Sequence, residues 1–172
     1  MNFLKIGIIG YGRLGGFYAK YCKAFNADIF VYDPNKSVKN KSIKQVKSLE
    51  SLLQNCDIIA LHVHLNKKTY HMINSQNINK MKKNVVIINT SRGEVVDEAS
   101  IISFLKKNKN AKYACDVIEN EINNKKNNRL INFSKQTNQI IITPHIGGMT
   151  IEAQQIAYHR IADKLNYSFK YD

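Results

Sequence analysis

The chain of 172 residues is long enough for one domain with a substantial buried core, and 44% of its residues are hydrophobic. No apolar run approaches the about 18 residues that a membrane-spanning helix needs. The formal net charge of +13 would suit a nucleic acid or an anionic membrane, but it comes mostly from scattered lysines. No dense basic block with interleaved aromatic residues is present, so we expect a solvated lysine surface and neither kind of partner.

The amino terminus and the cysteines indicate a cytoplasmic protein. The opening "MNFLKIGIIG" has no small-residue cleavage site, and we interpret it as a first strand rather than a signal peptide. The three cysteines, Cys22, Cys56 and Cys115, form no CxxC pair and no cluster at metal-ligand spacing. We therefore expect reduced thiols and no metal site.

Apolar strands and amphipathic helices alternate along the chain. The segments predicted as strands are 3–10, 28–33, 57–63, 84–90, 111–117 and 139–145. The segments predicted as helices are 13–26, 48–55, 74–82, 96–108 and 150–169, with Ser48 and Asp97 as N-caps and a long last helix. This alternation predicts an α/β fold, a single-domain Rossmann-type doubly wound parallel sheet with helices on both faces.

One connection breaks the alternation. The segment "ENEINNKKNNRLINFSKQTN", residues 119–138, is polar and long for a loop between two elements. Its middle, "RLINF", can form a short helical turn. We interpret the segment as a functional or mobile loop.

A glycine turn follows the first strand. Gly10, Gly12 and Gly15 have the GxGxxG spacing of a dinucleotide-binding turn, and Asp33 ends the second strand. The glycines permit a tight turn, close approach of a pyrophosphate and close helix packing, and the helix N-terminus attracts the phosphates. Asp33 can accept hydrogen bonds from a ribose and repels a 2′-phosphate, which favours NAD over NADP. The alternative is a tight strand–helix turn in another α/β protein.

Four polar residues follow later predicted strands, where ligands gather in open α/β sheets. They are Arg92, Asp116, Glu121 and His145. An arginine can hold a carboxylate in two parallel hydrogen bonds, and a histidine beside a glutamate can donate a proton. Together they suit hydride transfer to a 2-oxo acid. Singly, each could instead be a surface charge, a strand-end cap or a turn residue.

With these motifs, the sequence resembles the D-isomer-specific 2-hydroxy acid dehydrogenases. The matching stretches occur in the family's order and are "GIIGYGRLGG", "CDIIALHVHLNKKTYHMIN", "MKKNVVIINTSRGEVVDE", "YACDVIENE" and "IITPHIGGMTIEA". The "GGMTIEAQ" end is most similar to the phosphoglycerate dehydrogenase branch. The chain departs from the family at His64 and at Ile122, since proline is usual at both positions.

The resemblance implies roles for the matched residues. Arg92 binds the carboxylate and carbonyl of the substrate, His145 is the acid/base, Glu121 orients it, and Asp116 contacts the nicotinamide carboxamide. Besides the glycines, the implied NAD contacts are Arg13, Leu14, Asp33, Val63, His64, Thr69, Thr90 and Ser91.

The chain is only half as long as members of this family. The resemblance implies that residues 1–172 are the NAD-binding domain and that the separate substrate domain is absent from this chain. It further implies an NAD-dependent oxidoreductase for a D-2-hydroxy acid/2-oxo acid pair, a homodimer, and dependence on a missing or separate substrate-domain chain. The alternative is an NAD(H)-binding module without catalysis, acting as a sensor or interaction domain.

Overall fold

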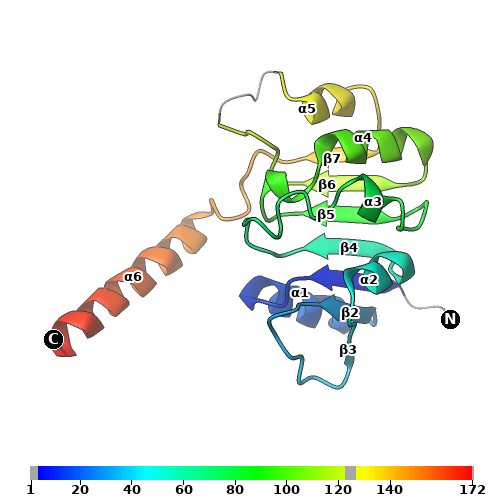
Figure 1. Cartoon of the computed structure of the whole chain (residues 1–172). Coiled ribbons are helices and arrows are strands. Elements are labelled where there is room, and N and C mark those ends of the chain that lie inside the picture. The colour runs from blue at the N-terminus through cyan, green and yellow to red at the C-terminus, as the bar shows by residue number, and fades with distance from the viewer. Residues whose placement is uncertain (1–3, 123–126, 172) are drawn as a thin grey trace.

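One parallel sheet organises the chain, as Figure 1 shows. The computed structural model describes residues 4–122 and 127–171, and within them seven strands lie in the order β3-β2-β1-β4-β5-β6-β7. They are β1 (Lys5–Ile9), β2 (Asp28–Tyr32), β3 (Ile43–Gln45), β4 (Ile58–Leu61), β5 (Val86–Asn89), β6 (Lys112–Cys115) and β7 (Ile140–Ile142). Every adjacent pair is parallel. This order confirms the predicted Rossmann-type fold.

The predicted helices are all present. They are α1 (Arg13–Ala24), α2 (Leu49–Asn55), α3 (Ser75–Ile78), α4 (Glu98–Lys107) and α6 (Ile151–Tyr171), with a 3₁₀ turn η1 (Gly93–Val95) before α4. The "RLINF" turn is the start of α5 (Arg129–Ser134). Both predicted N-caps form, since Ser48 accepts a hydrogen bond from the Ser51 amide and Asp97 accepts one from the Ala99 amide.

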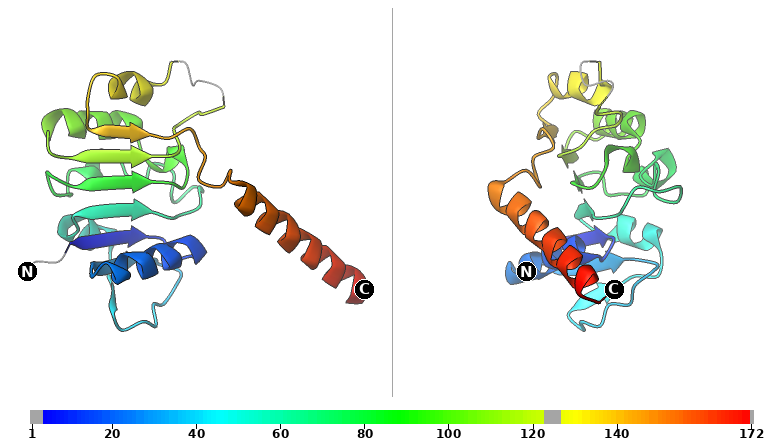
Figure 2. Two further views of the ribbon diagram at one scale, coloured as in Figure 1. Left: turned by 180° about the vertical axis from the view of Figure 1, so that it is seen from behind. Right: turned by 90° about the vertical axis from the view of Figure 1, so that its left-hand side faces the viewer.

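Right-handed crossovers distribute the helices unequally between the two faces of the sheet. The chain moves one way from β1 to β2 and the other way from β4 to β7, so α1 lies on one face and α2 to α5 on the other (Figure 2). The larger core cluster joins α2 to α5 to the sheet through Leu53, Ile78, Ile101 and Leu130. The smaller cluster packs Ala19 of α1 against β1 and β2.

The helix at the carboxyl end does not close the fold. Figures 1 and 2 show α6 projecting away from the sheet instead of covering it. The described residues leave the α1 face of the sheet uncovered over β5 to β7, where Ile141 is 67% exposed and Val86 and Ile88 are half-buried. The prediction of helices over both faces is therefore correct only beside β1 and β2, whereas the last helix predicted over 150–169 forms as α6 without covering the sheet. The helical period of α6 does form, but the large apolar side chains described on it, among them Ile156, Ile161 and Leu165, face solvent. None of the helices described has the length and apolar character to span a membrane.

Candidate active site

The glycine turn joins β1 to α1. Gly10 has a φ of +91°, and a Cβ there would lie 2.6 Å from the carbonyl oxygen of His62. A Cβ at Gly15 would lie 2.1 Å from the carbonyl oxygen of Gly10, whereas one at Gly12 would meet nothing within 4 Å. Gly10 and Gly15 are thus required by the fold itself. Gly12 leaves its backbone open to a ligand, at the N-cap of a helix without an acidic side chain in its first turn.

Asp33 lies against this turn. Its Oδ2 accepts a hydrogen bond of 2.8 Å from the Tyr11 amide, and its Oδ1 accepts one of 2.9 Å from the Asn35 amide. The carboxylate therefore stands at the edge of the sheet where the glycine turn opens. Open glycine backbone, helix N-terminus and carboxylate are the features that a bound NAD needs, so the residues present fit this cofactor.

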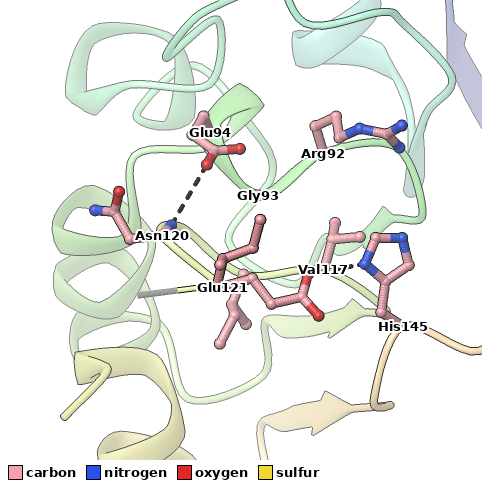
Figure 3. Close-up of a pocket in the computed structure, with 9 residues that line it drawn as sticks. Arg92, Gly93, Glu94, Val117, Asn120, Glu121 and His145 are labelled. Atoms are coloured by element: carbon pink, nitrogen blue, oxygen red, sulfur yellow. Dashed lines mark hydrogen bonds and ion pairs between the residues drawn. The ribbon is translucent and has the colours of Figure 1, made fainter. Parts of the chain in front are cut away.

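A second group of residues surrounds a pocket of about 610 Å³. Figure 3 shows Arg92, Glu121 and His145 around it, brought together from three different loops. The remaining lining residues are Gly93, Glu94, Val117, Ile118, Asn120 and Ile122. The structure thus unites the three residues to which the sequence assigns catalytic roles.

His145 and Glu121 form a pair. Nδ1 of His145 lies 2.8 Å from Oε2 of Glu121, and the two side chains are 45% and 20% exposed. Because Nδ1 faces the carboxylate, Nε2 is the ring nitrogen left for a proton exchange with a ligand. His145 has a φ of +57°, a left-handed conformation that its surroundings hold in place.

Asp116 fixes the turn that carries His145. Its carboxylate accepts hydrogen bonds from the hydroxyl of Thr143 and from the amides of Ile146 and Gly147, at 3.0 and 2.8 Å. Burial opposes ionisation, but these hydrogen bonds outweigh it, so the pKa of Asp116 lies below its ordinary value. Its contact with nicotinamide stays a prediction. The geometry gives it the additional task of holding the His145 turn.

Arg92 stands on a loop held by a residue that the sequence analysis missed. The buried Asn89 donates from Nδ2 to the carbonyl of Arg92, and its Oδ1 accepts hydrogen bonds from the amide and the hydroxyl of Ser91. A Cβ at Gly93 would lie 2.0 Å from the carbonyl carbon of Ile118. The loop with Arg92 therefore packs directly on the loop that leads to Glu121.

The other predicted NAD contacts lie at the same edge of the sheet. Arg13 and Leu14 are exposed in the first turn of α1, and His64 and Thr90 are exposed after β4 and β5. Val63 is half-buried after β4. Thr69 is buried, and its hydroxyl donates to the carbonyl of His64 at 2.6 Å, so it shapes the loop. Their contacts with the cofactor stay predictions.

Two further interactions beside the pocket were not predicted. His71 pairs with Glu119, and the amide of Glu119 donates to the buried carboxylate of Glu98 at 2.8 Å. Burial raises the pKa of Glu98. These contacts join loops that are distant in the sequence, and no spacing of residues in the sequence predicts them.

Comparison with known proteins decides the family. The sequence model of the D-isomer specific 2-hydroxyacid dehydrogenase NAD-binding domain matches residues 2–147. The chain belongs to this dehydrogenase family. It is 36% identical to D-3-phosphoglycerate dehydrogenase of Haemophilus influenzae over 160 residues, which cover 93% of this chain and 39% of that protein. It is 37% identical to glyoxylate reductase of Thermofilum pendens over 153 residues, or 87% and 44% of the two chains.

Solved structures of the dehydrogenase fold agree. D-lactate dehydrogenase of Aquifex aeolicus, complexed with NAD and lactic acid, superposes with a TM-score of 0.85 at 32% identity, covering 97% of this chain and 54% of that one. An acyclic imino acid reductase complexed with NADPH and D-Arg gives 0.86 at 27% identity, covering 97% and 51%. This chain therefore carries the family's NAD-binding domain and spans about half the length of the proteins it matches.

Proposed function

We propose that this chain supplies the NAD-binding and catalytic half of an oxidoreductase that interconverts a D-2-hydroxy acid and its 2-oxo acid. The observation that carries the proposal is the meeting of Arg92, Glu121 and His145 around one pocket, at the same sheet edge as the glycine turn. Cofactor binding alone needs no such arrangement. The family's named members act on small acids of this kind, which supports the same substrate class here.

Arg92, His145 and Glu121 have different roles, which follow from their charges. Arg92 holds the carboxylate of the substrate and polarises the carbonyl at C2, because its guanidinium donates in parallel to both groups. When bound, NADH supplies the hydride that C2 receives. His145 gives the proton to the carbonyl oxygen from Nε2, which completes the hydroxyl group, and takes it back in the reverse direction. Glu121 stabilises the protonated imidazole from the Nδ1 side, at 2.8 Å.

We propose that a substrate domain, in a covalently joined segment or a separate chain, covers this half. The chain exposes 11675 Å², whereas a compact monomer of 19.7 kDa exposes about 8600 Å². Exposed apolar side chains lie on α6, such as Ile156, Ile161 and Leu165, and on the uncovered sheet face at Ile141, and parallel sheets are normally covered on both faces. Without this cover, water weakens the electrostatics of the pocket, so the chain by itself turns over slowly.

A homodimer is the second part of this assembly. An exposed apolar stripe at helical spacing consists of Leu14, Phe17 and Tyr21 on α1 and of Phe25 at its C-cap. The stripe is suited to packing against its own copy across a two-fold axis. The cytoplasmic location proposed for the protein agrees with its three free cysteines.

The second candidate function is an NAD(H)-binding module without catalysis. The observation in its favour is the open pocket of a chain that spans about half of its relatives. The two candidates agree on NAD binding and differ only in turnover.

The deciding experiment combines a fluorescence titration with NADH and an assay of NADH oxidation with hydroxypyruvate. We expect Arg92→Ala to keep NADH affinity and to lower the rate at least about 100-fold. Arg160→Ala, which removes an exposed arginine of α6 outside the pocket, is the matched control. NADH binding without any turnover, both alone and with a substrate domain added, would favour the module instead.

A further inference from the structure

The two ends of the pocket differ in charge. In Figure 3, Arg92 and His145 lie on the right of the pocket, and Glu94 and Asn120 lie on the left. We propose that Glu94 selects the substrate by the group attached beyond C2. The favoured substrate is a 2-hydroxy or 2-oxo acid whose tail donates hydrogen bonds, and an acid with a phosphate tail is rejected. This inference rests on the proposed function and names the substrate class of the same pocket.

Glu94 is held on a rigid element. It is the middle residue of η1, between the buried residues Gly93 and Val95. Its carbonyl accepts a hydrogen bond of 2.8 Å from the amide of His71, and the amide of Ile73 donates to the carbonyl of Val95 at 3.1 Å. The backbone that carries the carboxylate is therefore fixed at this end of the pocket.

The charge of Glu94 is not neutralised by a neighbour. The other carboxylates nearby have partners, since Glu119 pairs with His71 and Glu121 pairs with His145. Across residues 4–122 and 127–171, Glu94 has no ion-pair partner, although the chain carries a net charge of +13. Its Oε1 accepts one long hydrogen bond, 3.4 Å from the amide of Asn120. The carboxylate thus retains capacity to accept from a ligand.

The position and charge of Glu94 determine which group at the tail of the substrate the pocket favours. With the substrate carboxylate at Arg92, the tail extends toward Glu94 across a pocket of about 610 Å³. A hydroxyl or ammonium group there gains a charge-assisted hydrogen bond. A phosphate group instead brings negative charge beside an unpaired carboxylate, and such juxtaposition is a strong means of excluding a ligand.

The test is a series of three-carbon acids that differ only in the tail. Each is titrated by calorimetry into the protein saturated with NADH, so that the complex cannot react. The acids are D-lactate with a methyl tail, D-glycerate with a hydroxyl tail, D-isoserine with an ammonium tail and 3-phospho-D-glycerate. We expect glycerate or isoserine to bind at least about tenfold more tightly than phosphoglycerate. The affinity for lactate should lie between these two values. The hydroxyl and ammonium arms show which donor Glu94 prefers.

Glu94→Gln removes the charge and keeps the shape. We expect this variant to reduce the ratio of the affinity for isoserine to the affinity for phosphoglycerate at least about tenfold. Glu50→Gln makes the same charge change on α2, away from the pocket, and should leave the ratio as it is. Equal affinities across the series, or a ratio that E94Q does not alter, would overturn the inference, and so would the absence of binding by every acid. The assay of NADH oxidation with hydroxypyruvate separately tests the proposed function.

Discussion

His145 and Glu121 meet at 2.8 Å although 24 residues separate them in the chain. His145 comes from the turn after β7 and Glu121 from the loop after β6, and these strands are neighbours in the sheet. Because parallel neighbours end at the same edge, the pair forms between two adjacent strand ends rather than within one local motif. The geometry assigns one ring nitrogen to Glu121 and the other to a ligand.

The first prediction concerns this pair. We expect His145→Gln to lower kcat about 100-fold to 10000-fold, since it removes the proton donor. Glu121→Gln keeps the hydrogen bond but not the charge and lowers kcat less. Both variants should bind NADH as the parent chain does. His159→Gln on α6 is the matched control. Turnover that is unaffected in His145→Gln would remove the assigned role.

The glycines of the first turn make the second prediction, because they separate folding from binding. Gly10→Ala places a Cβ at 2.6 Å from a carbonyl oxygen at positive φ, and we expect a loss of more than about 2 kcal/mol in the free energy of unfolding. Gly12→Ala meets no atom within 4 Å, so it keeps stability but weakens NADH binding at least about tenfold. Gly16→Ala, inside α1 and also in open space, should keep NADH affinity and stabilise by roughly 0.5–1 kcal/mol. Thermal denaturation of all three variants measures their stability, and titration with NADH measures their affinity for the cofactor.

Asp33 makes the third prediction, on the choice of cofactor. Its carboxylate already accepts from the amides of Tyr11 and Asn35, so it is fixed beside the glycine turn, where we predict the ribose of the cofactor. We expect the parent chain to bind NADH at least about tenfold more tightly than NADPH, and Asp33→Asn to reduce this ratio. Asp163→Asn on the exposed α6 is the control. A preference for NADPH in the parent chain would contradict the assignment.

Asp116 predicts how stability depends on pH. Its pKa in the folded protein lies below the unfolded value of about 3.9, so its contribution is present above that value and is lost as the pH falls through the folded pKa. We expect Asp116→Asn to cost about 1–2 kcal/mol at pH 7, because it weakens three hydrogen bonds. The difference from the parent chain should shrink below about pH 4. Urea denaturation at several pH values measures it, and a difference that is constant with pH would contradict this origin.

Most of the fold could be predicted because its strands are apolar runs, of which β1 and β4 are buried on both faces. The edge strand β3 was missed, since only Ile43 of its three residues is buried. The helix α6 was predicted from its period, but its packing was not. A periodic apolar stripe predicts a face suited to being covered, and only the tertiary structure shows whether the chain covers it itself.

The site divides in the same way. The glycine turn, Arg92 and His145 follow strands directly, so parallel topology brings them to one edge. The roles of Asn89 and of the His71–Glu119 pair come from contacts between loops, and sequence patterns contain no such information. Glu94 belongs to the same class, because only the path of η1 shows that its carboxylate lines the pocket.

The projecting α6 links the folding of this chain to the binding of a partner. A helix of 21 residues without tertiary support is marginal in water, because most helical stability in proteins comes from packing of an apolar face. A chain that covers α6 adds its binding free energy to that of helix formation, about 2.7 kcal/mol at 100 times the dissociation constant. The helical signal of this chain should therefore rise as a binding partner is added, and the rise measures the fraction of α6 that is bound.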